Sequence, residues 1–230
     1  MKKIFSIILI ISISLSCLAF SIELNSYNKD FYIKSYKKYE VPKITNKSIE
    51  DLSEITDDII SYLKNSGGDE LLSKHFNEKE VLHMRDVQNL FNISRWVKII
   101  GLIVSGMILY YFYRKKEYIS LGKTLFIGLF INHILFGILA ILASIDFNRY
   151  FTYFHLLFFS NDLWILNPKT DLMIQMLPEE FFMNIAFRIV LSFFILLAIL
   201  QIVGYLFIKK GRDRNANHIK KNERLFYRKK

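Results

Sequence analysis

Residues 124–144 read TLFIGLFINHILFGILAILAS, a run of 21 residues without Asp, Glu, Lys or Arg. A helix rises about 1.5 Å per residue, so a run of this length crosses about 30 Å, the thickness of the hydrocarbon core of a bilayer. Three further runs are long and apolar enough to do the same, approximately 4–22, 97–113 and 184–208. The sequence therefore predicts an α-helical integral membrane protein with four transmembrane helices.

These runs divide the chain into alternating membrane and water-exposed segments. In order, they are a first transmembrane helix acting as a signal-anchor (1–22), an extracytoplasmic segment (23–96), the second transmembrane helix (97–113), a cytoplasmic loop (114–123), the third transmembrane helix (124–144), an extracytoplasmic aromatic segment (145–183), the fourth transmembrane helix (184–208) and a basic cytoplasmic tail (209–230). Lys2-Lys3 before an apolar run is also typical of a cleaved signal peptide. No small-x-small cleavage site stands out, so we expect this helix to be retained.

The formal net charge of +10 reflects topology. If both termini are cytoplasmic, that side holds sixteen Lys and Arg against three Asp and Glu, a net of +13, and the rest of the chain has a net charge of −3. An excess of Lys and Arg in cytoplasmic loops is the positive-inside pattern. We therefore expect cytoplasmic termini, a tail ending in residues 228–230 that rests on anionic lipid headgroups, and no nucleic-acid partner, with an RNA-binding tail as a minor alternative.

The first outer segment is predicted to hold two helices. One begins at the capping pair Ser48 and Asp51 and ends at the turn formed by residues 65–68. The other begins near Asn77, which pairs with Glu80, and runs close to or into the second span. The preceding stretch, 23–47, shows no clear period, and short strands or coil are expected there.

The second outer segment, 145–183, is rich in Phe, Tyr and Trp. It is too apolar to be a solvated loop and too polar to cross the membrane. Asn167-Pro168 favours a short helix through Met176, and Pro178 starts the helix that becomes the fourth span. We expect an interfacial or re-entrant segment that forms one wall of a cleft open to lipid, with an extracytoplasmic helical cap from the first segment nearby.

Two histidines in these outer segments are candidates for chemistry. His83 has Asp86 three residues on, on the same helical face, where its carboxylate can accept a ring N–H and fix the tautomer. His155 lies within an aromatic run that leads to Trp164. A lone histidine in such a setting is more often structural, so spacing alone leaves that alternative open for each.

Other kinds of site are mostly excluded by the residues present. The chain has no Gly-x-Ser-x-Gly elbow, His-Glu-x-x-His pair, phosphate loop or dinucleotide fingerprint. Cys17 stands alone in the first span, so no disulfide is possible. Asp162 and Asp171 with the two histidines would make an unusual zinc site, because no two of them share a ligand-like short spacing. We expect no metal and no cofactor.

Three stretches together resemble the bacterial lipoprotein intramolecular transacylase family. They read EVLHMRDV at 80–87, FHLLFFSNDLWILNPKTD at 154–171 and PEEFF at 178–182. The resemblance covers nearly the whole chain. It implies a bacterial cell-membrane enzyme that moves the sn-2 acyl chain of a diacylglyceryl-cysteine lipoprotein onto the free α-amino group of the same cysteine, and it places the family's two essential histidines at His83 and His155.

The implied reaction suits His83 and His155, which their positions in the outer segments already mark as candidates. An amine that attacks an ester in the same molecule needs no enzyme nucleophile, only groups that take and give a proton. We expect His83 as the base and His155 as acid or oxyanion partner, on the extracytoplasmic face. Further residues are expected to bind or orient the substrate: Arg85, Asp86, Asn161, Asp162, Trp164 and Asp171.

The sequence is also compatible with two rival functions. One is another lipid enzyme of the outer leaflet, either a hydrolase or an acyltransferase with a separate donor, and the absence of a nucleophile counts against the hydrolase. The other is a non-catalytic sensor or assembly protein. For the transacylase, the expected partners are membrane-anchored diacylglyceryl lipoproteins and membrane lipids, and the chain is expected to be a monomer.

Overall fold

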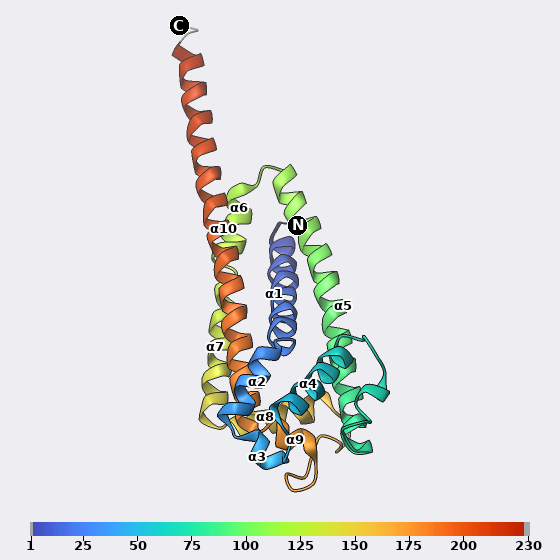
Figure 1. Ribbon diagram of the computed structural model, residues 1–230. Helices are drawn as coiled ribbons and strands as arrows, with labels where there is room; N and C mark the ends of the chain where they lie inside the picture. Colours follow the sequence, from blue (N-terminus) through green and yellow to red (C-terminus); the bar gives the residue numbers. More distant parts are fainter. Residues whose placement is uncertain (1, 228–230) are drawn as a thin grey trace. The chain divides into compact units, whose positions relative to one another are not determined.

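The structure is a computed structural model that describes residues 2–227, with the side chains of 218, 221–223 and 225–227 outside the description. Every regular element in this part of the chain is a helix (Figure 1). The elements are α1 (Lys2–Ser26), α2 (Lys29–Lys38), α3 (Val41–Thr45), α4 (Ile49–Leu63), the short 3-10 helix η1 (Asp69–Leu71), α5 (Glu78–Arg114), α6 (Tyr118–Phe126), α7 (Phe130–Ile145), α8 (Phe147–Phe158), α9 (Leu172–Met176) and α10 (Glu179–Tyr227).

Four helical stretches among the described residues are long and apolar enough to cross a membrane: Lys2–Ser26, Glu78–Arg114, Tyr118–Ile145 and Glu179–Asn217. This confirms the all-helical membrane fold expected from the sequence. In α5 the charged residues before Trp96 restrict the apolar part to the second half of the helix, which contains the span expected at 97–113. The last three residues of the expected lipid-binding tail, 228–230, lie outside the described residues.

The chain forms two compact units. Unit 1 contains residues 1–18, 97–137 and 192–230, and unit 2 contains residues 19–96 and 138–191. Each unit has its own cluster of buried apolar side chains.

Unit 1 is held together by close helix approach and by hydroxyl pairs. Ser12 of α1 lies 2.8 Å, oxygen to oxygen, from Ser105 of α5, and the Ser16 hydroxyl donates to the Lys98 carbonyl oxygen over 3.1 Å. A Cβ at Gly101 would lie 2.2 Å from Ser16 Oγ, so the absence of a side chain allows α1 and α5 to touch. Small residues and hydroxyl pairs of this kind are typical of helix contacts in membranes, where the hydrophobic effect does not drive association.

The third span is interrupted at residues 127–129, between α6 and α7. An interrupted helix leaves carbonyl oxygens without their usual partners, which is costly in hydrocarbon. Gln201 of α10 supplies one replacement, because its amide donates to the Phe126 carbonyl oxygen over 3.2 Å. The interruption is therefore satisfied within unit 1 by a polar side chain of another span.

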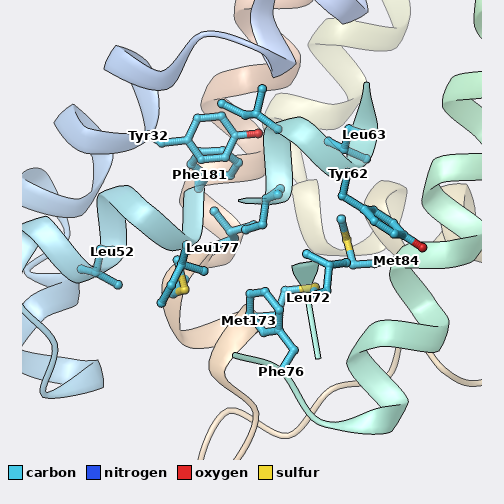
Figure 2. Packing of buried hydrophobic residues seen from close by; sticks show 14 of the residues in the cluster. Tyr32, Leu52, Tyr62, Leu63, Leu72, Phe76, Met84, Met173, Leu177 and Phe181 are labelled. Atoms are coloured by element: carbon cyan, nitrogen blue, oxygen red, sulfur yellow. The ribbon is translucent and has the colours of Figure 1, made fainter. Parts of the chain in front are cut away.

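Unit 2 packs short helices around a core of aromatic, aliphatic and methionine side chains (Figure 2). Helix α2 packs against α4, and α3 packs against α9. Phe181, at the start of α10, lies 4.9 Å from Tyr32 of α2, centroid to centroid. Met173 and Leu177 bring the second outer segment into the same core as Leu72 and Met84 of the first. This shared core holds the two outer segments together.

The prediction of strands or coil at 23–47 is wrong, because α2 and α3 occupy most of that stretch. The Asn28 side chain caps α2 by accepting the Phe31 N–H over 3.1 Å. Tyr32 and Tyr36, four residues apart, then share the buried face. With only ten residues in α2, this spacing was too short to stand out as a helical period.

The predicted helices that follow are confirmed, with one exception. Ser48 and Asp51 form the expected capping box of α4, and α5 begins at the expected Asn77–Glu80 pair and continues without a break into the second span. Pro178 precedes α10 as expected. The short helix expected from Asn167-Pro168 instead begins at Leu172, because residues 167–171 form turns and Asp171 is the N-cap of α9.

Candidate active site

His83 lies in the second turn of α5. The first turn is fixed by a reciprocal pair, in which the Glu80 carboxylate accepts the Asn77 N–H over 2.9 Å and the Asn77 side chain accepts the Glu80 N–H over 3.0 Å. His83 is one turn further and is 8% exposed. Its Nδ1 is buried without a hydrogen-bond partner among the described residues.

His155 lies in the last turn of α8. The Asp146 side chain caps this helix by accepting the Arg149 N–H over 3.1 Å. His155 Nδ1 is 2.7 Å from the Phe151 carbonyl oxygen. Because a carbonyl oxygen only accepts, Nδ1 carries the proton, and in the neutral ring Nε2 holds the free lone pair. His155 is 7% exposed.

The two imidazoles lie side by side in unit 2. Their ring centroids are 6.1 Å apart and their planes are inclined by 34°. Phe159 contacts both rings, with its centroid 5.3 Å from His83 and 5.6 Å from His155. Seventy-two positions separate the two histidines in sequence, so this pairing is a product of the fold.

Aromatic side chains enclose His155. Trp164 stacks on its ring at 4.7 Å and 26°, and Phe151 meets it edge-on at 4.4 Å. The indole Nε1 of Trp164 is buried and has no hydrogen-bond partner in the described part of the chain. A buried donor without a partner is uncommon in native structures, and it is suited to bind an oxygen of a substrate.

The pKa values of both histidines are shifted in the same direction. Burial, aided by the nearby His155, lowers the pKa of His83 to about 4 against the opposing charge of Asp86. Burial also lowers the pKa of His155, and its hydrogen bond to the Phe151 carbonyl opposes the shift. Both rings are therefore neutral near pH 7, so either one can accept a proton.

Asp86 was expected to bind His83, and its contact in the structure is with another residue. Its Oδ2 accepts the side-chain N–H of Asn161 over 2.9 Å. This bond ties the loop after α8 to α5, beside the two histidines. Asp86 influences His83 through its charge.

The other residues expected to bind or orient the substrate, Arg85, Asp162 and Asp171, make their hydrogen bonds and ion pairs with residues other than the two histidines. Arg85 forms an ion pair with Asp69, which also accepts the Tyr62 hydroxyl over 2.8 Å. Asp162 is exposed, and its carbonyl oxygen accepts the Ile165 N–H in a turn. Asp171 is buried, and its carboxylate accepts the Asn167 N–H over 2.7 Å and the Asn77 side-chain N–H over 3.1 Å.

Glu80, expected from the sequence only as the acidic partner in the cap of α5, has a second contact. Its second carboxylate oxygen accepts the Met173 N–H over 2.7 Å, across 93 positions of sequence. The acidic residue at the third helical position was visible in the sequence, but its distant partner was not. Among the described residues, no group of three or more His, Cys, Asp or Glu side chains is arranged to hold a metal ion.

Comparison with known proteins gives consistent matches. The family model described as lipoprotein intramolecular transacylase Lit matches residues 7–182. The membrane-integral lipoprotein intramolecular transacylase Lit from Bacillus cereus is similar in structure, with a TM-score of 0.82 and 27% identity over 92% of this chain and 98% of that one.

Two structures of variants of the Bacillus cereus protein also match. In one a histidine is replaced by arginine, and in the other by alanine. Each has a TM-score of 0.79 and 25% identity; the first covers 93% of this chain and 95% of its own, and the second 92% and 96%. A search of curated proteins found no match.

Proposed function

Because the chain belongs to the Lit family of lipoprotein intramolecular transacylases, we propose that His83 and His155 perform acyl transfer within a single membrane lipoprotein. The protein is a membrane-integral acyltransferase. The observation that carries the proposal is the pair of buried, neutral imidazoles with centroids 6.1 Å apart in an aromatic shell. A neutral pair can take a proton at one ring and give one at the other.

The reaction moves the sn-2 acyl chain of the diacylglyceryl group to the α-amino nitrogen of the same N-terminal cysteine. A C–N amide bond forms, the ester C–O bond breaks, and one proton passes from the nitrogen to the glyceryl oxygen. Both reacting groups belong to one molecule, so holding them in contact supplies much of the rate enhancement. The products are an N-acyl, S-monoacylglyceryl lipoprotein, and no covalent enzyme intermediate is needed.

The hydrogen bond of His155 suggests a division of labour that differs from the one expected from sequence. Its Nδ1–H is held by the Phe151 carbonyl, which leaves Nε2 as the acceptor. We therefore assign His155 as the base that receives the amine proton and His83 as the donor to the departing glyceryl oxygen. The proton passes from His155 to His83, which delivers it to the departing glyceryl oxygen, so that both rings end neutral.

Other residues receive supporting roles in this proposal. The unpartnered indole N–H of Trp164 is suited to donate to the acyl carbonyl oxygen as negative charge develops on it. Asn161 and Asp86 hold the loop that carries Trp164 against α5. Arg85 and Asp162 are exposed and can meet polar headgroup atoms, and Asp171 orders the loop that follows Trp164.

We also propose that unit 2 faces the outside of a bacterial cell, with both termini in the cytoplasm. The distribution of Lys and Arg supports this orientation. Helix α8 supports contact with lipid, because it begins at Phe147, directly after the apolar α7, and exposes large side chains such as Leu157. The partners are then diacylglyceryl lipoproteins and lipids of the outer leaflet, and the enzyme acts as a monomer.

Mass spectrometry of lipoprotein N-termini tests the function. The chain is expressed in a bacterium whose lipoproteins otherwise lack the lyso form, and N-acyl, S-monoacylglyceryl cysteine is the expected product. His83→Ala and His155→Ala should each reduce it by about 100-fold or more, as expected for loss of an acid–base group. His75→Gln is the control, because His75 is bonded to Asp58, 2.9 Å away, outside the histidine pair. Unchanged lipopeptides with confirmed wild-type expression would refute the proposal.

A further inference from the structure

Glu80 is one of the most deeply buried charged groups in the described part of the chain, at 1% exposure. Burial of a carboxylate is costly unless hydrogen bonds compensate for the lost water. Both of its oxygens have such partners, the Asn77 N–H at 2.9 Å and the Met173 N–H at 2.7 Å. These bonds oppose the rise in pKa that burial causes.

The two partners of Glu80 belong to different outer segments. Asn77 precedes α5, whereas Met173 is in the first turn of α9. The Asn77 side chain adds a second link by donating to Asp171 over 3.1 Å. Lys79 adds a third, because its ammonium group donates to the Ile165 carbonyl oxygen over 2.5 Å. We call the links made by Asn77, Lys79 and Glu80 the α5 clamp.

The α5 clamp connects the two segments that form the histidine site. On α5, Glu80 is one turn before His83. On the other side, Ile165 directly follows Trp164, the residue that stacks on His155 at 4.7 Å. The clamp therefore joins the helix that carries one histidine to the segment that packs on the other.

We infer that Glu80 is a positioning residue for acyl transfer, which fastens residues 165–173 to the first turn of α5 and so sets the placement of Trp164 and His155 relative to His83. The inference rests on the proposed function and names a residue outside the predicted site. A carboxylate suits this role because it offers two acceptors to two backbone N–H groups. Glutamine at the same position has one acceptor and directs an NH₂ group at one of these N–H donors.

The first test measures the Trp164–His155 stack directly and needs no activity. In a Trp96→Phe background Trp164 is the sole tryptophan, because the chain has two. An imidazolium quenches the fluorescence of a stacked indole more strongly than a neutral ring does, so fluorescence against pH reports protonation of His155. The full-length protein in nanodiscs should give a midpoint below 6.5, since burial lowers this pKa.

Glu80→Gln is expected to reduce the quenching and to move the midpoint up toward 6.5, because a loosened stack exposes His155 to water. The rate constant kcat should fall about 10- to 100-fold while KM changes less than about twofold, as expected for misplaced catalytic groups. Glu78→Gln is the matched control, because Glu78 is exposed on the same turn and should leave both measurements unchanged.

Two results would overturn the inference. One is a Glu80→Gln protein with wild-type kcat and an unchanged fluorescence titration. The other is a loss of kcat with an unchanged titration, which would show that Glu80 does not act through the Trp164–His155 stack. If Glu80→Gln fails to fold, Asp171→Asn perturbs the same segment through the Asn77 link and is judged by the same two outcomes. A normal wild-type titration without transacylase activity would contradict the proposed function and leave the clamp intact.

Discussion

The two histidines are held by different kinds of contact, although both are less than a tenth exposed. His155 has a fixed tautomer, because its Nδ1–H is bonded to the Phe151 carbonyl. Within the part of the chain that the structure describes, His83 has no equivalent bond at Nδ1. A fixed proton suits a base that must present one lone pair, and an unfixed ring suits a group that must accept a proton and pass it on. The two histidines of the site therefore differ in whether a hydrogen bond fixes the proton on Nδ1.

The lowered pKa of His83 predicts that acid destabilises the protein. An unfolded histidine titrates near 6.5 and folded His83 near 4, so between these values the unfolded chain binds a proton that the folded ring does not. Stability therefore falls as pH falls through this window, by about 3 kcal/mol at most.

His83→Gln removes this contribution. Its melting temperature in detergent should fall less than that of the wild type between pH 7 and pH 4. An equal or larger fall in the melting temperature of the variant would contradict the lowered pKa of His83. His155→Gln should also reduce the fall in melting temperature, because the pKa of His155 is lowered as well.

The contact between α1 and α5 predicts opposite outcomes at two glycines of one helix. A Cβ at Gly101 would lie 2.2 Å from Ser16 Oγ and 2.7 Å from the Ser12 carbonyl oxygen, whereas a Cβ at Gly106 meets nothing within 4 Å. Gly101→Ala should therefore lower the thermal stability, because backbone atoms of α1 must move. Gly106→Ala should leave it unchanged or raise it by up to about 1 kcal/mol, since alanine favours the helix.

Differential scanning calorimetry in detergent compares the melting temperatures of the two variants. Equal effects would show that α1 does not pack on α5 as described. The same contact gives a reason for retaining the first helix, because Leu9 and Ile13 of α1 are buried in unit 1.

Local elements were predictable from the sequence, and contacts between distant elements were not. Ser48 and Asp51 are three positions apart, so the cap of α4 is readable from neighbouring residues. The acceptor of the Met173 N–H is Glu80, and only the folded core of unit 2 brings these residues together. The same holds for the histidine pair, whose members the sequence identified without showing that their rings are neighbours.

The membrane orientation of the whole molecule can be tested by cysteine labelling. With Cys17 replaced by serine, single cysteines are placed at the exposed positions Ser66 and Lys115. A membrane-impermeant maleimide added to intact cells should label Ser66→Cys. Lys115→Cys should react only after the cells are permeabilised, because its loop is expected in the cytoplasm. The reverse pattern would place the histidine pair on the cytoplasmic side.

The aromatic shell around the histidines also bears on the fidelity of the enzyme. The acyl ester has two competing acceptors, the tethered amine and bulk water, and water would release a free fatty acid. Phe159, Phe151 and Trp164 cover imidazoles that would otherwise activate water as readily as an amine. Under the proposed function, the shell therefore limits hydrolysis, and thinning it should divert acyl chains from the amide product to free fatty acid.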